Sequence, residues 1–163
     1  MSVRLVPWGD GDFPLLVRLL GDPAMTEHLG GPEDDAALRT RQRRYVEAED
    51  GVFKVVDSAG ADVGWVGFWE HEVDGERAFE TGWAIVPEHQ GRGLAGAATA
   101  AAIERMRAVP DHPRYVYAWP NVANGPSNGI CRKLGFELVR EVELDYPPGS
   151  GQMSRWNEWR LAL

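Results

Sequence analysis

The sequence predicts an α/β fold with a mixed (α+β) sheet, and helices are expected to cover both faces of that sheet. Short runs rich in β-branched and aromatic residues recur along the chain, and helical patterns separate several of them. The 163 residues suffice for one domain with a substantial core, whereas two domains would each be small and would need added cross-links. The chain shows no linker, internal repeat or low-complexity tract, so we expect a single domain over residues 1–163.

In the first half of the chain, prolines, glycines and turn residues separate the expected elements. Pro7 stops the first strand, Asp12 is expected to cap the first helix, and Pro87 stops the central strand of the sheet. The expected elements are a strand at 3–6, a helix at 12–20, a loop at 22–33, a helix at 34–49, and strands at 52–57, 63–69 and 79–86.

The second half begins with a glycine-rich turn that leads into an alanine-rich helix ending near residue 108. Pro126 sits where a further helix can start, and Gly135 where it can end. The other expected elements are strands at 115–119, 136–144 and 153–161 and a loop at 146–151.

Composition and charge exclude several classes of function. A formal net charge of -8 argues against nonspecific nucleic-acid binding, because such binding needs Lys and Arg to neutralise phosphates. An acidic surface suits a cationic partner, although it also simply favours solubility. The lone Cys131 has no internal disulfide partner, and no metal-ligand cluster surrounds it. With no signal-peptide pattern at the start and no apolar run of membrane-spanning length, we expect a cytoplasmic protein without a membrane or metal partner.

The glycine-rich turn is the most informative feature of the sequence. Gln90, Gly91, Arg92 and Gly93 connect a buried strand to a helix, which leaves bare backbone N–H groups around the helix N-terminus. Those donors and the positive end of the helix dipole favour an anion, so the turn predicts a ligand that carries a pyrophosphate. The alternative is a tight connection without a ligand. No Lys-Ser/Thr follows, which excludes a P-loop, and the late position in the chain argues against an NAD site.

Two motifs resemble those of the GNAT acetyltransferase superfamily. The segment from Gln90 to Ala95 resembles the family's Gln/Arg-x-x-Gly-x-Gly/Ala signature. The segment from Asn124 to Ser127, followed by residues 131–136, resembles its Asn-x-x-Ser and Lys-Leu-Gly-Phe pattern. Residues 22–30 and 156–161 resemble the branch with ribosomal-protein N-terminal and some aminoglycoside acetyltransferases. The resemblance implies a mostly antiparallel, twisted sheet of six to seven strands with about four helices, splayed near its central strand.

The resemblance also implies acetyl-CoA as the acetyl donor, and it assigns residues to that ligand. Gly82 is expected to form a bulge that admits the pantetheine arm, and an N–H near Ile85 to stabilise an oxyanion, a role worth ~3 kcal/mol. Asn124 and Ser127 would bind the pantetheine or the 3′ side of CoA; the alternatives are a turn residue and a helix cap. The remaining expected contacts are Ala84, Ile85 and Val86 along the pantetheine, and Gln90, Gly91, Arg92, Gly93, Leu94, Ala95 and Gly96 around the pyrophosphate.

Direct attack by an amine needs a base, because alkyl amines are mostly protonated at pH 7. Glu80 lies two residues before Gly82, where many relatives carry Glu, and we expect it to accept the proton through water. The alternative is an exposed strand carboxylate or an orienting salt bridge. Glu70 and Glu72, near the end of the preceding strand, are second choices.

The residue at the position of the family's general acid differs from the family pattern. Many members place a Tyr seven residues after the Asn, and this chain has Cys131 there. A thiol can donate a proton, but a small buried packing residue is the commoner meaning of a lone cysteine. The other candidates are water, Ser127 and Tyr146, and a further alternative is that the leaving thiolate needs no acid.

Function is therefore expected to be acetyl transfer from acetyl-CoA to a small-molecule amine or a protein N-terminus. The alternative is a non-catalytic acyl-CoA-binding or regulatory module. Four tryptophans on expected strands are either core residues or the lining of an acceptor cleft: Trp65, Trp69, Trp83 and Trp119. Dimers are common in the family, so a homodimer is a further expectation.

Overall fold

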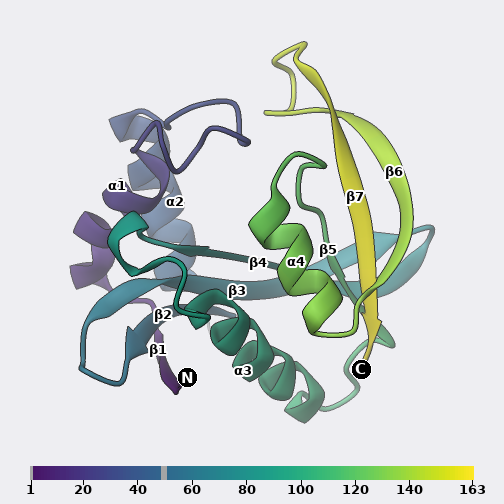
Figure 1. Ribbon diagram of the computed structural model, residues 1–163, viewed down its shortest axis with the longest axis horizontal. Coiled ribbons are helices and arrows are strands. Elements are labelled where there is room, and N and C mark those ends of the chain that lie inside the picture. Colours follow the sequence, from purple (N-terminus) through teal and green to yellow (C-terminus); the bar gives the residue numbers. More distant parts are fainter. Residues whose placement is uncertain (1, 49–50) are drawn as a thin grey trace. The chain divides into compact units, whose positions relative to one another are not determined.

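The computed structural model describes residues 2–48 and 51–163, and these contain seven strands and four α-helices (Figure 1). The sheet has the strand order β1-β2-β3-β4-β5-β7-β6, with β4 and β5 parallel and the pairs β1/β2, β2/β3, β5/β7 and β6/β7 antiparallel. The strands are β1 (Val3–Pro7), β2 (Val52–Asp57), β3 (Asp62–Val73), β4 (Glu76–Ile85), β5 (Tyr115–Ala118), β6 (Glu137–Asp145) and β7 (Met153–Ala162). The helices are α1 (Phe13–Leu20), α2 (Asp35–Glu47), α3 (Leu94–Ala108) and α4 (Gly125–Lys133). The mixed sheet expected from the sequence is confirmed.

The largest departure from expectation lies at the closed end of the β3–β4 hairpin, where β3 runs four residues past the expected end at 69 and β4 begins three residues before the expected start at 79. Its added residues are mostly charged and exposed, so they carry no hydrophobic signal. Asp74 and Gly75 close the hairpin with φ values of 50° and 81°, as a two-residue turn of this hand requires. The expected helix end at residue 49 lies outside the described residues. The splay near Gly82 and the single-domain assignment stay predictions.

Contacts divide the chain into two compact units, and each is described by itself. The first comprises Met1–Gly67 and Trp83–Ala102, and the second Phe68–Gly82 and Ile103–Leu163. In the first unit, α1 and α2 pack side by side (Figure 1). The apolar stripe of α1, at Leu15, Leu16, Leu19 and Leu20, is buried as its spacing predicts.

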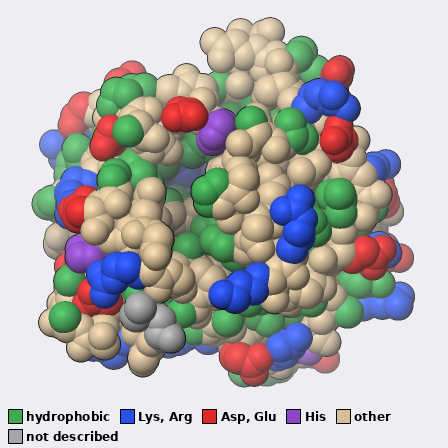
Figure 2. Space-filling model, viewed as in Figure 1, with side chains coloured by type: hydrophobic (Ala, Val, Ile, Leu, Met, Phe, Trp, Pro, Cys, Tyr) green, Lys and Arg blue, Asp and Glu red, His purple; other side chains and the backbone are tan. Residues whose placement is uncertain are grey.

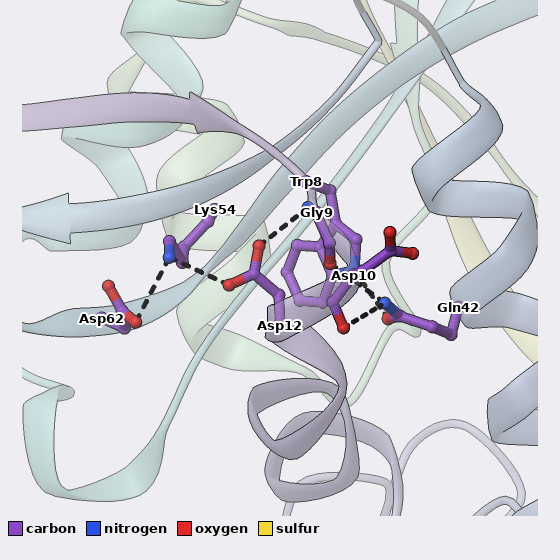
Figure 3. A network of polar contacts seen from close by, with 7 residues as sticks. All are labelled: Trp8, Gly9, Asp10, Asp12, Gln42, Lys54 and Asp62. Carbon is purple, nitrogen blue, oxygen red and sulfur yellow. Dashed lines mark hydrogen bonds and ion pairs between the residues drawn. The ribbon is translucent and has the colours of Figure 1, made fainter.

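A polar network anchors the start of α1 in the first unit (Figure 3). Asp12 stands at the N-cap position of α1, as expected, but its side chain makes no capping bond to that helix, because its carboxylate turns back to other partners. It accepts the N–H of Gly9 at 2.8 Å and an N–H of Lys54 at 2.9 Å. Nearby, Gln42 accepts the indole N–H of Trp8 at 2.8 Å and donates to the carbonyl of Gly9 at 3.0 Å. These bonds tie β1, α2 and β2 to one turn.

The second unit has a long antiparallel ribbon of β6 and β7, whose inner strand continues the sheet through β5 (Figure 1). A buried asparagine joins the ribbon to α4. Asn128 is 2% exposed and accepts hydrogen bonds from Asn157 and Trp159, both at 2.9 Å. It donates to the carbonyls of Asn121 and Asn124 at 3.0 and 2.8 Å, so its whole amide is used.

The surface mixes charges of both signs. On the face drawn in Figure 2, acidic and basic side chains lie interspersed rather than gathered into one large field of either sign. Among the helices of the described residues, none combines the length and apolar character that crossing a membrane requires.

Candidate active site

The glycine turn in the first unit has the backbone that its sequence predicts. Gly91 and Gly93 have φ values of 76° and 77°, in the left-handed region that side chains with a Cβ seldom adopt. The first bond of α3 runs from Ala97 N–H to the Gly93 carbonyl at 3.1 Å. The N–H groups of Leu94, Ala95 and Gly96 therefore precede the helical bonding pattern. A Cβ at Gly91, Gly93 or Gly96 would have no atom within 4 Å, so the turn leaves room for a ligand to approach the backbone closely.

Gln90 fixes this turn to the end of β4. Its side-chain amide donates to the Ile85 carbonyl at 2.9 Å and lies 3.5 Å from the sulfur of Met25. The N–H of Val86 donates to Val63 of β3 at 2.9 Å. Because successive N–H groups of a strand point to opposite edges, the N–H of Ile85 points away from β3. The oxyanion role of that N–H stays a prediction, and the Gln90 side chain bonds the backbone of Ile85.

Arg92 is held by two side chains of the same unit. Its Nη1 donates to Nδ1 of His89 at 2.8 Å, and its Nη2 lies 3.4 Å from Oδ2 of Asp57. The Asp57 side chain is 2% exposed and also accepts the N–H groups of Ala59 and Ala61. Those N–H groups, that of Ala61 foremost, and the charge of Arg92 hold the pKa of Asp57 below its usual range. The sequence predicted the positive charge at the turn but missed its buried carboxylate partner, 35 residues away.

Glu80 in the second unit faces two side chains of β3. Its Oε2 accepts the indole N–H of Trp69 at 2.9 Å and lies 3.8 Å from Nδ1 of His71. The carboxylate is partly exposed, at 26%. Glu80 is thus partnered by an indole and an imidazole.

Glu70, a second choice for the base, has a different partner. Its carboxylate forms a two-pronged ion pair with Arg77, at 2.7 and 3.2 Å. The hydrogen bond from Arg77 lowers the pKa of Glu70. A carboxylate whose anion is stabilised in this way is a weak proton acceptor, so the geometry favours Glu80. Glu72 is exposed on β3.

The Asn124 and Ser127 motif forms the first turn of α4 in the second unit. Oδ1 of Asn124 accepts the backbone N–H of Ser127 at 3.2 Å, which makes Asn124 the cap of this helix. The alternative role of Ser127 as the cap is therefore wrong. Asn128 was not among the residues predicted from the motif. Its side-chain amide donates to the Asn121 and Asn124 carbonyls and so fixes the backbone that leads into α4. The only sign of this role in the sequence is an Asn within an expected helix.

Cys131 is completely buried on α4. Burial raises the pKa of its thiol to about 12. These are the properties of a packed thiol that keeps its proton, and a catalytic role for Cys131 stays a prediction.

The four tryptophans on strands have different surroundings. Trp65 is buried in the core, whereas the ring of Trp69 is 40% exposed. The indole nitrogens of Trp83 and Trp119 are buried, and within residues 2–48 and 51–163 they have no hydrogen-bond partner. Buried donors without a partner are uncommon in proteins. Over the same residues, no group of three or more His, Cys, Asp or Glu side chains is arranged to hold a metal ion.

Comparison with protein families identifies the class of enzyme. The family model of the acetyltransferase (GNAT) domain matches residues 2–137. The chain therefore belongs to the GNAT acetyltransferases and is an acyltransferase, as its two motifs predicted.

Solved structures share the fold over almost the whole chain. Spermidine N-acetyltransferase from Vibrio cholerae, in complex with CoA and spermine, is 18% identical, with a TM-score of 0.80 over 98% of this chain and 95% of that one. Ribosomal-protein-alanine N-acetyltransferase from Brucella melitensis is 19% identical, with a TM-score of 0.75 over 100% of both chains. A phosphinothricin acetyltransferase from Sinorhizobium meliloti, in complex with acetyl-CoA, is 18% identical, with a TM-score of 0.77 over 100% of this chain and 89% of that one.

Proposed function

We propose that this chain transfers the acetyl group of acetyl-CoA to a primary amine, which attacks the thioester directly through a tetrahedral intermediate. The observation that carries the proposal is the α3 N-terminus. There, two glycines with positive φ and three N–H groups outside the helical bonding pattern form an anion-binding backbone. The residues present thus fit a pyrophosphate.

In this proposal the chain holds the donor by its backbone. The N–H groups from Gly91 to Gly96 bind the pyrophosphate, and Arg92 adds a cation at the turn. Residues 84–86 pair with the pantetheine arm as an added strand would. The N–H of Ile85 stabilises the oxyanion, and Asn124 and Ser127 bind a further part of the coenzyme.

Glu80 acts as the base, because the attacking amine must lose a proton before or during attack. Its Oε1 takes no part in the contacts to Trp69 and His71, both of which involve Oε2. This oxygen is therefore the one assigned to the acceptor or to a water that bridges to it. With Cys131 buried, the leaving thiolate takes its proton from water, Ser127 or Tyr146 in this proposal.

The acceptor is proposed as a small-molecule amine or a protein N-terminus. Proteins of the same fold are named for spermidine, for the alanine of a ribosomal protein and for phosphinothricin, which shows that the fold serves different acceptors. The partly exposed carboxylate of Glu80 beside the Trp69 ring suits an ammonium group.

The test is CoA release with a panel of amines and N-terminal peptides. Wild-type turnover, and a loss of about 10²-fold or more in Glu80→Gln, would support the proposal. Glu76→Gln is a matched control, since Glu76 lies on the same strand and is exposed. Acetyl-CoA binding without product from any amine would instead identify a non-catalytic acyl-CoA-binding module. Binding itself is checked by thermal shift, because a ligand at 100 times its Kd adds roughly 2.7 kcal/mol of stability.

A further inference from the structure

We propose that Trp69 and His71 serve Glu80 in the reaction, Trp69 as the residue that positions its carboxylate and His71 as the group that takes the proton from it to solvent. This inference rests on the proposed function, in which Glu80 is the base. It concerns two residues of β3 that neither sequence motif includes.

The hairpin of β3 and β4 brings these three side chains to one face. Side chains alternate between the two faces of a strand, so Trp69 and His71, two residues apart, share a face. Their contacts to Oε2 of Glu80 place Glu80 on that face too. The opposite face carries the buried contact of Phe68 with Phe79, whose rings are 5.1 Å apart.

The indole of Trp69 fixes the position of the carboxylate. It donates to Oε2 at 2.9 Å, a distance expected for a bond between an N–H group and an anionic oxygen. Glu80 has several rotatable bonds, and this bond selects one of their conformations. Oε1 takes no part in this bond, but fixing Oε2 also restrains Oε1, because both oxygens belong to one rigid carboxylate group. Trp69 is therefore a positioning residue.

His71 provides a route for the proton. Its Nδ1 lies 3.8 Å from Oε2 of Glu80, and its side chain is 41% exposed. That separation is longer than a hydrogen bond, so transfer needs a small rotation of the exposed ring or one bridging water. Histidine suits the task because its ordinary pKa lies near neutrality.

The proton balance of the step is complete without another reactant. The Glu80 carboxylate accepts one proton from the ammonium group of the acceptor, directly or through water, and becomes a carboxylic acid. The carboxylic acid passes that proton from Oε1, through one bridging water, to Nδ1 of the neutral imidazole of His71, which releases its Nε2 proton to bulk water. Glu80 returns to the carboxylate, and exchange with solvent restores the starting tautomer of His71.

Two carboxylates of this hairpin, Glu70 and Glu80, differ in a way that supports the assignment. Glu70 is paired with Arg77, a permanent cation that opposes protonation of the carboxylate. Glu80 faces an uncharged indole and an imidazole that can itself exchange protons. The contacts of Glu80 therefore leave it a partner that can take a proton onward, whereas the contact of Glu70 does not.

The experiment measures kcat and KM for an accepted amine in His71→Ala, with and without added imidazole. We expect kcat to fall about tenfold, the KM for acetyl-CoA to stay near the wild-type value, and imidazole to restore kcat with increasing concentration. Imidazole should have no effect on the wild type or on the double variant His71→Ala/Glu80→Gln. His112→Gln is the matched control, because His112 lies in the same unit and its imidazole contacts the carbonyl of the neighbouring Pro113. It should keep wild-type kcat.

Trp69→Phe tests the positioning role, since it keeps a ring and removes the N–H donor. We expect kcat to fall about tenfold, with acetyl-CoA binding unchanged. Wild-type kcat in His71→Ala, or a loss that imidazole does not relieve, would overturn the proton route; wild-type kcat in Trp69→Phe would overturn the positioning role. Both of these outcomes leave the proposed function intact. A wild-type enzyme that releases no CoA with any amine would instead overturn the proposed function, and the inference with it.

Discussion

The carboxylate of Asp57, at the end of β2, lies 3.4 Å from the guanidinium of Arg92 in the glycine turn. One oxygen of Asp57 accepts the N–H groups of Ala59 and Ala61, and the other faces Arg92. A single buried carboxylate therefore organises the β2–β3 turn and also restrains the cation of the proposed pyrophosphate site. The stability of this part of the first unit should depend on the charge of Asp57.

Asp57→Asn is expected to lower stability near neutral pH and to lose that effect in acid. The folded state holds the pKa of Asp57 below its ordinary value of 3.8, so the unfolded state binds more protons around that pH. The contribution is present above pH 3.8 and is lost as pH falls through the lower, folded-state pKa. Urea unfolding of both proteins from pH 7 to pH 3 checks this. A difference that stays constant across that range would contradict it.

Gly93→Ala should weaken binding of CoA as well as the fold. A side chain forced into the left-handed region costs ~1–2 kcal/mol, and a turn distorted to relieve that strain misplaces the N–H groups of α3. Loss of one such contact corresponds to about a tenfold higher Kd, measurable by calorimetry.

Gly75→Ala is the matched control, because Gly75 has a φ of 81° and equally open surroundings in the β3–β4 turn. It should lose similar stability and keep the wild-type Kd for CoA. Equal effects of both variants on Kd would show that the glycine turn has no special role in binding.

Gln42→Ala should destabilise the first unit by about 2–3 kcal/mol, as judged from chemical unfolding. It removes the acceptor for the buried indole of Trp8, which is left without its partner, and one of the two donors to the Gly9 carbonyl, which keeps the N–H of Asp12 (Figure 3). Arg43→Ala, at the next position of α2 and exposed, should change stability by less than about 0.5 kcal/mol. A small effect of Gln42→Ala would mean that water replaces the amide.

Cys131 should fail to react with a thiol reagent in the native protein at pH 8 and react fully after unfolding. The buried thiol has a pKa raised to about 12, so almost no thiolate is present. Its contribution to stability is present below about pH 9, the ordinary thiol value, and is lost as pH rises toward 12.

If Cys131 acts by packing, Cys131→Ala should keep kcat within about twofold and lose about 1 kcal/mol of stability. A large drop in kcat at unchanged stability would instead assign the thiol a part in the chemistry.

Local patterns in the sequence were enough to predict most elements and the glycine turn. Prolines, glycines and hydrophobic periodicity act over a few residues. The positive φ values of Gly91 and Gly93 are likewise a property of the local backbone, and glycine adopts them readily. The same locality explains the errors. The charged half of the β3–β4 hairpin lacks an apolar pattern, and the partners of Asp12 lie on other elements.

The amino-acid sequence by itself therefore determined the fold class, the family and the backbone suited to an anion at α3. Only the tertiary structure decided which side chains act together, such as Asp57 with Arg92, Gln42 with Trp8, and His71 with Glu80. The physical reason is that strand register and helix packing set these pairings. The residues of these pairs are 9 to 35 positions apart in the sequence and come into contact only in the folded chain. Their spacing in the sequence therefore does not reveal the contact.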